Sequence, residues 1–385
     1  MSFDFGAPMP ERKPAYKVWP TSGQRLALID GDMLPYIAGY NVPEQNPVTA
    51  QYKVASGECA CIEETPEFLD YADHLDWLVN DWVTKAGADS MRLYMTDSAS
   101  NFRIGIAFSQ EYKGKRDPVK PAFFYEGRQH LLDMHGGILS TNCEADDLMT
   151  IVKWERLREL EEEGIELGSE MHKMFDDIVI VSQDKDLRVT PGWHCDPANN
   201  LMIWATPLGE LIPKYKKGEV RHYEYWPTVK GQPVEPGSTN LPYDTFSKGK
   251  RKGEVKTKRV CLGTRPSTQI DKLKGHGLKF FYSQLVTGDT VDGYSGIPGA
   301  GATKAMEILD QCTSEEMLYA AVLKEYRKVY GESTLATNYR GGSLRLTPEQ
   351  MLLEQGRLAH MQTRDGELWR DHEYCPQGDS DEWSD

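Results

Sequence analysis

Short apolar runs alternate along the chain with longer segments whose apolar residues recur at helical spacing. The runs at 25–30 (RLALID), 91–97 (MRLYMTD), 136–141 (GGILST) and 177–187 (DIVIVSQDKDL) predict buried strands. Segment 65–87 starts with the capping pair Thr65 and Pro66, and segment 144–164 is amphipathic and stops at Gly164, so both are predicted to be helices. Alternating strands and helices favour an α/β fold with a mostly parallel sheet flanked by helices.

The remaining segments have weaker patterns and set the expected domain boundaries. We expect a loose N-terminus (1–24), an α/β core (25–192) that includes a basic segment at about 98–125, a sheet extension followed by a variable basic insertion (193–275), a region of helices (276–375) and an acidic tail (376–385). Residues 41–65 and 101–125 are predicted to be irregular, the insertion to be partly flexible and the tail to be disordered. Within the helical region, a helix, a glycine-rich hairpin and a second helix are predicted.

Composition and charge narrow the function classes. The chain has 385 residues, of which 39% are hydrophobic and 27% charged, and no apolar run reaches the roughly 18 residues of a membrane span. The N-terminus lacks the apolar stretch of a signal peptide, and the seven cysteines form no CxxC pair, so we expect a cytoplasmic protein with reduced thiols. The net charge of −15 disfavours a nucleic-acid partner at first, but bases cluster at 111–117 and 246–259.

Carboxylates gather where the predicted strands end. The residues concerned are Asp30, Asp97, Asp184 and Asp186 after strands, Glu144, Asp146 and Asp147 at the start of the helix in CEADDLM, and Asp289 and Asp292 in GDTVDG. Parallel sheets bind ligands beyond the carboxyl ends of their strands. Oxygen ligands without Cys or His suit Mg²⁺ or Mn²⁺. This many acids at one sheet edge indicate two ions of the kind that clamp a phosphodiester.

The segment GIPGAG (296–301) lies between two predicted helices and follows the last acid pair directly. A hairpin of this kind exposes backbone N–H groups at a helix N-terminus, which suits a DNA phosphate. We therefore select Gly296, Gly299, Gly301 and Lys304 as DNA-binding residues. The alternative is an ordinary turn between two helices.

In this order, Asp30, Asp97, EADD, SQDKDL and GDTVDGYSGIPGAG resemble the motifs of the flap-endonuclease-like 5′ nucleases, and most of all the phage-encoded 5′→3′ double-strand DNA exonucleases. The resemblance covers roughly residues 25–190 and 275–312. It implies a PIN-like α/β core followed by a helix–hairpin–helix clamp, two divalent ions that activate a water, and a K⁺ bound by the hairpin.

The resemblance also assigns roles to single residues. It places Asp30, Asp97, Glu144 and Asp146 around the first ion, Asp184, Asp186, Asp289 and Asp292 around the second, and Asp147 near both. Asp32 departs from many members of the family, which have a non-acid at that position. Segment 101–117 matches the arch over the site, with Arg103, Lys113 and Arg116 as catalytic cations that orient the scissile phosphate. The alternative for this segment is a solvated basic loop.

The sequence thus predicts a metal-dependent 5′→3′ exonuclease acting on duplex DNA, with flap or RNA-primer removal as further activities. Its expected setting is phage DNA replication, recombination or host DNA degradation in the bacterial cytoplasm, with replication proteins as partners of the acidic tail. Three alternatives stay open: a flap endonuclease, a haloacid-dehalogenase-like phosphatase suggested by LIDGD and GDTVD, and a non-catalytic DNA-end binder. The run KGKRKGEVKTKR is either a DNA-contacting arm or a solvated charge run.

Overall fold

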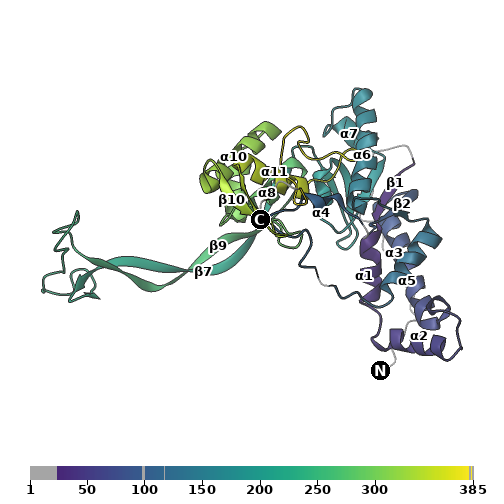
Figure 1. Ribbon diagram of the computed structural model, residues 1–385, viewed down its shortest axis with the longest axis horizontal. Helices are drawn as coiled ribbons and strands as arrows, with labels where there is room; N and C mark the ends of the chain where they lie inside the picture. The colour runs from purple at the N-terminus through teal and green to yellow at the C-terminus, as the bar shows by residue number, and fades with distance from the viewer. Residues whose placement is uncertain (1–23, 98–99, 117, 381–382, 384–385) are drawn as a thin grey trace. The chain divides into compact units, whose positions relative to one another are not determined.

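The computed structural model describes residues 24–97, 100–116, 118–380 and 383 (Figure 1). The chain forms two compact units: the first comprises the residues up to Ile212 and from Leu273 onward, and the second is Pro213–Lys272. Apart from Gln24, the segment expected to be loose at the N-terminus lies outside the described residues.

A six-stranded sheet forms the centre of the first unit, in the order β3-β2-β1-β4-β5-β6. Its strands are β1 (Leu26–Asp30), β2 (Ser90–Met95), β3 (Ile138–Leu139), β4 (Ile178–Val181), β5 (Gly192–Asp196) and β6 (Leu201–Ala205). All neighbours are parallel except β5 and β6, which form an antiparallel pair. Asp30 lies opposite Tyr94 and Ile29 opposite Val181, so β1, β2 and β4 end near the same edge. The predicted mostly parallel α/β fold is confirmed, and β5 and β6 lie at one end of the sheet.

Helices cover both faces of this sheet (Figure 1). One face packs against α1 (Leu34–Gly39), α3 (Pro66–Ala86) and α5 (Phe124–His135), and the other against α6 (Ala145–Glu162). α3 begins as predicted, because Thr65 Oγ1 accepts a hydrogen bond from Phe68 N at 3.3 Å, and it ends at Gly87 in the left-handed conformation.

Two ranges predicted to be irregular contain helices instead. They are α2 (Gln45–Ala55) and α4 (Phe102–Ile106), and α5 begins at the end of the second range. α2 buries only Ala50, so its sequence carries no apolar stripe from which a helix could be predicted. α4 is only five residues long, too short for a periodic pattern to be visible.

The rest of the first unit is mainly helical. It contains α7 (Glu170–Phe175), α8 (Gly277–Thr287), α9 (Ala302–Leu309), α10 (Glu315–Tyr330), α11 (Pro348–Ala359) and a hairpin of β10 (Thr334–Thr337) and β11 (Ser343–Leu346). Phe281, Leu352 and Phe108 belong to its shared core. Gly378 N donates to Ile106 O at 3.2 Å, and Trp383 packs against Phe108, so the expectation of a disordered tail is wrong for its described part. In the described part of the chain, no helix is both long and apolar enough to cross a membrane.

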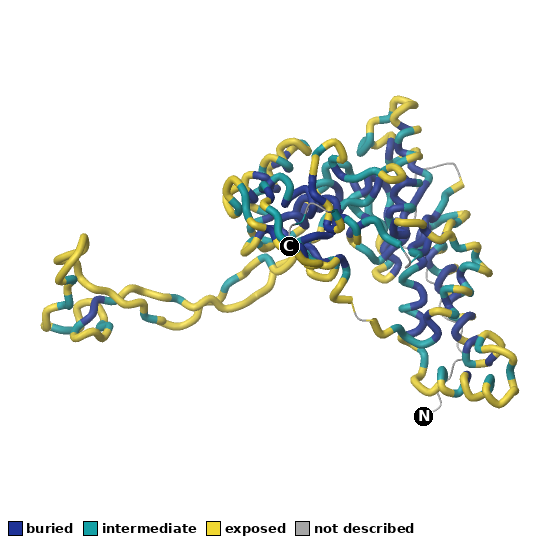
Figure 2. The backbone as a smooth tube through the Cα atoms, in the orientation of Figure 1, coloured by how far each residue is buried: buried dark blue, intermediate teal, exposed yellow. Residues whose placement is uncertain are grey.

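The second unit consists of most of two 20-residue strands and the segment that connects them. β7 (Glu210–Val229) pairs with β9 (Thr257–His276) and with the short β8 (Gln232–Pro233). Most of its residues are exposed (Figure 2). Because both faces of such a ribbon face solvent, no alternation of apolar and polar residues marks it in the sequence. The sequence predicts a partly flexible insertion here but not these two long strands.

Candidate active site

A cavity of about 160 Å³ in the first unit lies beyond the ends of β1 and β4. Its charged lining residues are Asp30, Asp32, Lys113, Arg116, Glu144, Asp146, Asp184, Asp186 and Asp292. They come from five separate segments: the end of β1, the basic segment 101–116, the start of α6, the turn after β4 and the hairpin after α8. The sheet edge where ligands are expected thus holds most of the acids selected from the sequence.

The end of β1 is held by packing that only glycine permits. A Cβ on Gly31 would lie 2.5 Å from Leu93 Cδ2 and 2.8 Å from Tyr94 O, so the chain passes directly against β2. Asp30, next to it, is buried and accepts a hydrogen bond from Ser182 Oγ at 2.8 Å. Asp32 accepts from Thr96 N at 3.0 Å and pairs with Arg128 at 2.6 Å. The turn therefore fixes two carboxylates at the cavity.

The three acids at the start of α6 have different environments. Glu144 N donates to Asp147 Oδ2 at 3.0 Å, which is half of a capping box, so Asp147 caps the start of the helix. Glu144 and Asp146 line the cavity. Asp147 is fully buried on the other side of the helix start. Glu144 is the N-cap residue and has an extended backbone, so the helical repeat does not set its direction, and it shares the cavity with Asp146.

A second group of acids forms between the turn after β4 and the hairpin after α8. Carboxylate oxygens of Asp186, Asp289 and Asp292 lie within 4.8 Å of one another, close enough to hold one cation. Gln284 Nε2 donates to Asp186 Oδ1 at 2.7 Å and orients it. Lys185 Nζ lies 3.0 Å from Asp186 and 3.4 Å from Asp289, so an ammonium group partly balances these acids.

Burial and then neighbouring charges raise the pKa of three acids at the cavity. Burial and then the charge of Asp32 raise the pKa of Asp30 to about 7, and burial and then the charge of Asp184 raise that of Asp186 to about 7. Burial, followed by the charge of Asp30, raises the pKa of Asp146 well above its usual range. A site that penalises its own negative charge in this way favours a bound cation. The donors are oxygens only, which fits Mg²⁺ or Mn²⁺.

Two cations of the basic segment reach the acids. Lys113 Nζ contacts Glu144, and the Arg116 guanidinium lies 3.0 Å from Asp292. The Lys113 backbone, at a φ of +55°, donates from N to Asp292 O at 3.1 Å. The segment therefore lies against the hairpin after α8 and brings both side chains to the cavity.

Arg103 and Asp147 are placed differently from their expected roles. The Arg103 guanidinium is buried and donates to both Asp147 oxygens at 2.6 and 2.8 Å and to the carbonyls of Leu358 and His360 at 3.1 and 2.7 Å. Asp147 also accepts from Gln362 N at 3.0 Å. Neither residue lines the cavity. Because each satisfies the other inside the protein, Arg103 is not available to a phosphate, nor Asp147 to a metal ion.

Asp32 lines the cavity, whereas Asp97, an expected metal ligand, does not. Asp97 follows β2, donates from its backbone N to Ser140 Oγ at 3.2 Å, and is not among the described residues that line the cavity. Asp32, whose role the family resemblance leaves in doubt, is among them. The pattern of residues at the two strand ends does not show which of these two acids faces the cavity.

Of the four residues selected for DNA binding, one is buried and three are at least partly exposed. Gly296 is buried at a φ of +62°, its N–H donates to Gln355 Oε1 at 3.0 Å, and a Cβ there would lie 2.3 Å from Gly288 N. The fold therefore requires glycine at position 296. Gly299 and Gly301 are exposed, with open space where a Cβ would be, and Lys304 lies 3.6 Å from Glu325. The outer half of the hairpin is thus the part open to a ligand.

The cavity also has walls outside the acidic and basic motifs. Tyr112 and Tyr294 line it, and Tyr112 Oη donates to Glu144 Oε2 at 3.1 Å. Leu358, Ala359 and Met361, at the end of α11, close another side. No local signal marks these three residues, since they reach the site from more than 170 positions further along the chain than β4.

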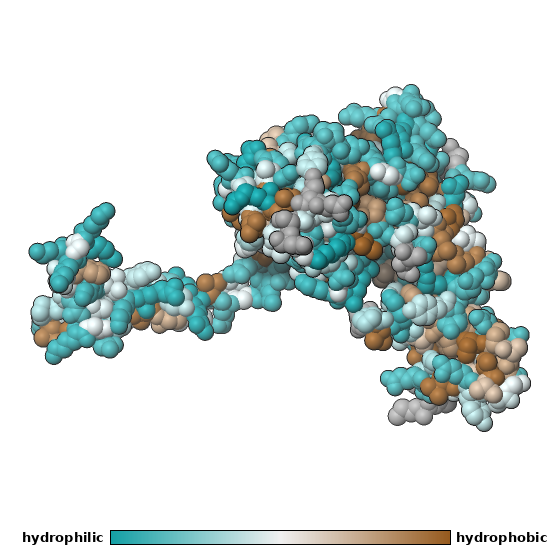
Figure 3. Space-filling view, viewed as in Figure 1, coloured by the Kyte–Doolittle hydropathy of each residue, from teal (hydrophilic) through white to brown (hydrophobic). Residues whose placement is uncertain are grey.

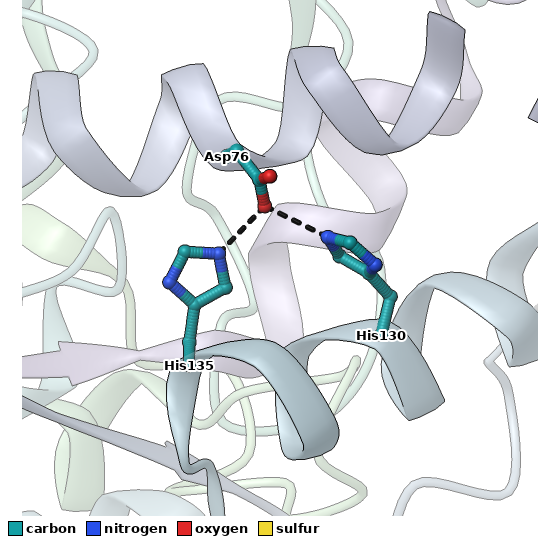
Figure 4. A group of neighbouring side chains, drawn as sticks. All are labelled: Asp76, His130 and His135. Carbon is teal, nitrogen blue, oxygen red and sulfur yellow. Dashed lines mark hydrogen bonds and ion pairs between the residues drawn. The ribbon is translucent and has the colours of Figure 1, made fainter. Parts of the chain in front are cut away.

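A separate polar group joins α3 to α5 (Figure 4). The Nε2 atoms of His130 and His135 lie 2.8 and 2.6 Å from the same Asp76 oxygen. Burial opposes the ionised form of Asp76, but the hydrogen bonds from His135 and His130 outweigh it and lower the pKa of Asp76. The three ligand atoms lie within 4.8 Å of one another, yet the carboxylate is already satisfied by both imidazoles. We assign this group to holding the two helices together.

Solved 5′ nucleases are among the structures that resemble this chain. The bacteriophage T5 flap endonuclease in a pseudo-enzyme–product complex with DNA and metal ions matches at 11% identity and a TM-score of 0.37, over 87% of this chain and 98% of that one. The same T5 protein co-crystallised with metal ions matches at 12% identity and 0.33, over 78% and 84%. A mutant of the T5 5′-exonuclease matches at 11% and 0.32, over 88% and 100%.

No protein-family model and no curated protein matches the chain. At TM-scores this low the three structures support no assignment of single residues. The function is therefore inferred from the side chains of the cavity.

Proposed function

We propose that the protein is a divalent-metal-dependent nuclease that hydrolyses phosphodiesters of duplex DNA from the 5′ end. One observation carries this proposal: acids from four separate segments and cations from a fifth meet at one cavity. A phosphatase of the haloacid-dehalogenase type would need Asp30 and its neighbours but has no use for Glu144, Asp146 and the hairpin acids.

Two groups of ligands support two Mg²⁺ or Mn²⁺ ions. Asp30, Asp146 and Asp184 are proposed to hold the first, with Glu144 and Asp32 beside it, and Asp186, Asp289 and Asp292 the second. When bound, such ions lower the pKa of a water and neutralise charge on the phosphate.

The chain's own residues position the substrate. Lys113 and Arg116 are proposed to turn from Glu144 and Asp292 to the phosphate oxygens once metal ions neutralise these acids, which would stabilise charge in the transition state. The open N–H groups near Gly299 and Gly301 are proposed to bind a backbone phosphate of the duplex, and K⁺ to bind at the same hairpin. The preference for a 5′ end comes from the order of the motifs along the chain, which resembles that of 5′ nucleases.

The test uses duplex DNA labelled at the 5′ end, incubated with the protein with and without Mg²⁺. We expect release of 5′ nucleotides or short oligomers only with the metal. Asp184→Asn should lower the rate by more than about 100-fold, because it removes a ligand at the cavity. Asp70→Asn, which changes an exposed acid on α3 by the same chemistry, is the matched control and should cut like the wild type.

Blunt, recessed and flapped substrates then separate exonuclease from flap endonuclease. A ladder of short products from blunt ends supports the exonuclease, whereas one cut at the base of a flap supports the endonuclease. If no substrate is cut with either metal, or if Asp184→Asn cuts as fast as Asp70→Asn, the proposed function or its ligand assignment is wrong.

A further inference from the structure

The second unit carries a charge opposite to that of the rest of the chain. Residues Pro213–Lys272 contain fourteen Lys and Arg and six Asp and Glu, a net charge of +8. Since the whole chain carries −15, the other residues together carry −23. All fourteen basic residues are exposed. On the face seen in Figure 3, the atoms of this unit are mostly those of hydrophilic residues.

The unit has little to hold it together from within. In the described part of the chain, none of its residues belongs to an apolar core cluster. A ribbon of two long strands without an apolar face is marginally stable in water, and exposed like charges weaken it further. An oppositely charged partner lying along the ribbon would remove this repulsion.

One face of the ribbon combines cations with aromatic rings. The Arg259 guanidinium lies 4.3 Å from the centre of the Tyr223 ring, so a residue of β9 and one of β7 share this face. Arg221 lies two residues before Tyr223 in β7, and side chains two positions apart in a strand share a face, so Arg221 belongs there too. Tyr225 follows at the next position of the same parity and is 70% exposed. We call Arg221, Tyr223, Tyr225 and Arg259 the Arg/Tyr face.

On the opposite face, two polar side chains bind groups within the unit. Trp226 Nε1 donates to Glu224 Oε2 at 3.1 Å, and Lys258 Nζ donates to the carbonyl of Gly231 at 2.7 Å. Arg259 and Lys258 are neighbours in β9, and adjacent residues of a strand point to opposite faces. The two positions therefore form a matched pair of one positive charge on each face.

We propose that the Arg/Tyr face of the second unit binds the phosphate backbone of DNA. The choice of DNA as the polyanion rests on the proposed nuclease function. Side chains on one face of a strand repeat about every 6.6 Å. Each DNA strand carries one phosphate per roughly 3.4 Å of helix axis, so several phosphates lie within the length of the ribbon. Tyrosine rings beside the arginines add contacts to sugars or bases.

The experiment measures binding of the full-length chain to a fluorescent duplex in EDTA, which prevents metal-dependent cleavage. Arg259→Gln should weaken binding several-fold, and the slope of log K against log salt should fall by about 0.9, the loss of one phosphate contact. Arg221→Gln with Arg259→Gln should lower the slope by about 1.8. Lys258→Gln removes the same charge from the other face and should leave both quantities close to wild type.

The outcomes separate this inference from the proposed function. If the protein cuts DNA but Arg259→Gln binds with the affinity and salt slope of the wild type, the Arg/Tyr face does not bind DNA. The inference then fails while the proposed function stands. Equal losses for Arg259→Gln and Lys258→Gln would also overturn it, because the charge of the unit and not this face would then be responsible. If no DNA is cut but only the Arg259 variant loses binding, the nuclease proposal fails and the inference stands.

Discussion

Replacing Arg103 tests whether this residue acts on the substrate or holds the protein together. The side chain is 1% exposed and Asp147 is fully buried. Arg103→Met would leave the Asp147 carboxylate without its partner and two carbonyl groups, of Leu358 and His360, without a donor. These contacts join α4, the start of α6 and the end of α11, so their loss is expected to loosen three segments at once.

The expected cost is large. Removing one partner of a buried ion pair destabilises a protein by about 3–5 kcal/mol, whereas replacing both partners by apolar residues is often close to neutral. Arg103→Met should therefore lower the free energy of unfolding by about that amount, and Arg103→Met with Asp147→Met should recover much of it.

The loss should also depend on pH. In the wild type burial opposes the charge of Asp147, but Arg103 lowers its pKa below the usual range, so its contribution to stability is present above the unfolded pKa and disappears as the pH falls. Without Arg103, burial alone would raise the pKa of Asp147, and stability would then decrease as the pH rises. The destabilisation should be larger at pH 8 than at pH 5.

Urea unfolding in EDTA at both pH values measures this, with single-turnover DNA cleavage by the folded fraction as the second readout. Lys113→Met is the control, because Lys113 lines the cavity and is only partly buried. It should lower cleavage by more than about 100-fold and stability by no more than about 1 kcal/mol. If Arg103→Met unfolds like the wild type while its cleavage is lost, Arg103 acts on the substrate and the structural reasoning is refuted.

Two further predictions follow from single side chains. Lys185→Ala should lower the Mg²⁺ concentration that gives half-maximal cleavage or half-maximal metal-induced stabilisation, because the ammonium competes with the metal at Asp186 and Asp289. The expected decrease is roughly 1.4- to 5-fold, the equivalent of an ion pair of about 0.2–1 kcal/mol. An unchanged or higher midpoint would contradict this. Burial, opposed by hydrogen bonds from Ser109, raises the pKa of Glu354 to about 7, so its effect on stability worsens as the pH rises from about 4.5 through 7. The free energy of unfolding of Glu354→Gln minus that of the wild type should therefore be up to about 3 kcal/mol larger at pH 8 than at pH 5, as measured by urea unfolding. The same pH profile for both proteins would count against this.

Local signals in the sequence were sufficient for the central sheet. β1, β2 and β4 are rich in apolar residues, and an acid ends β1 and follows β2 and β4 within three residues. α3 carries a cap, a proline and a glycine at the expected positions. Because strand ends and caps depend on a few adjacent residues, they can be found without knowledge of the fold. Their common edge then predicts that acids distant in sequence come together.

The sequence could not show which acids face the cavity. Asp147 and Arg103 are 44 positions apart, and only the path of the chain between them makes them a buried pair. Asp97 and Asp32 likewise differ in their relation to the cavity through packing around β2, although both follow strands. Motif order assigns such residues by analogy, whereas burial and partners depend on contacts made across the whole first unit.

The balance of charge at the cavity argues that the two proposed ions bind unequally. Arg116 contacts Asp292, and Lys185 lies beside Asp186 and Asp289, so an ion entering the second group must displace two cations of the protein. At the first group, burial and then the charge of Asp30 raise the pKa of Asp146, so an ion between these two acids relieves repulsion. The cation nearby, Lys113, contacts Glu144 beside them. The first site should therefore fill at a lower metal concentration than the second, and substitution of Lys185 should shift only the second of two binding steps in a Mn²⁺ titration by calorimetry. A single step, or an equal shift of both, would mean that the two groups of acids act as one site.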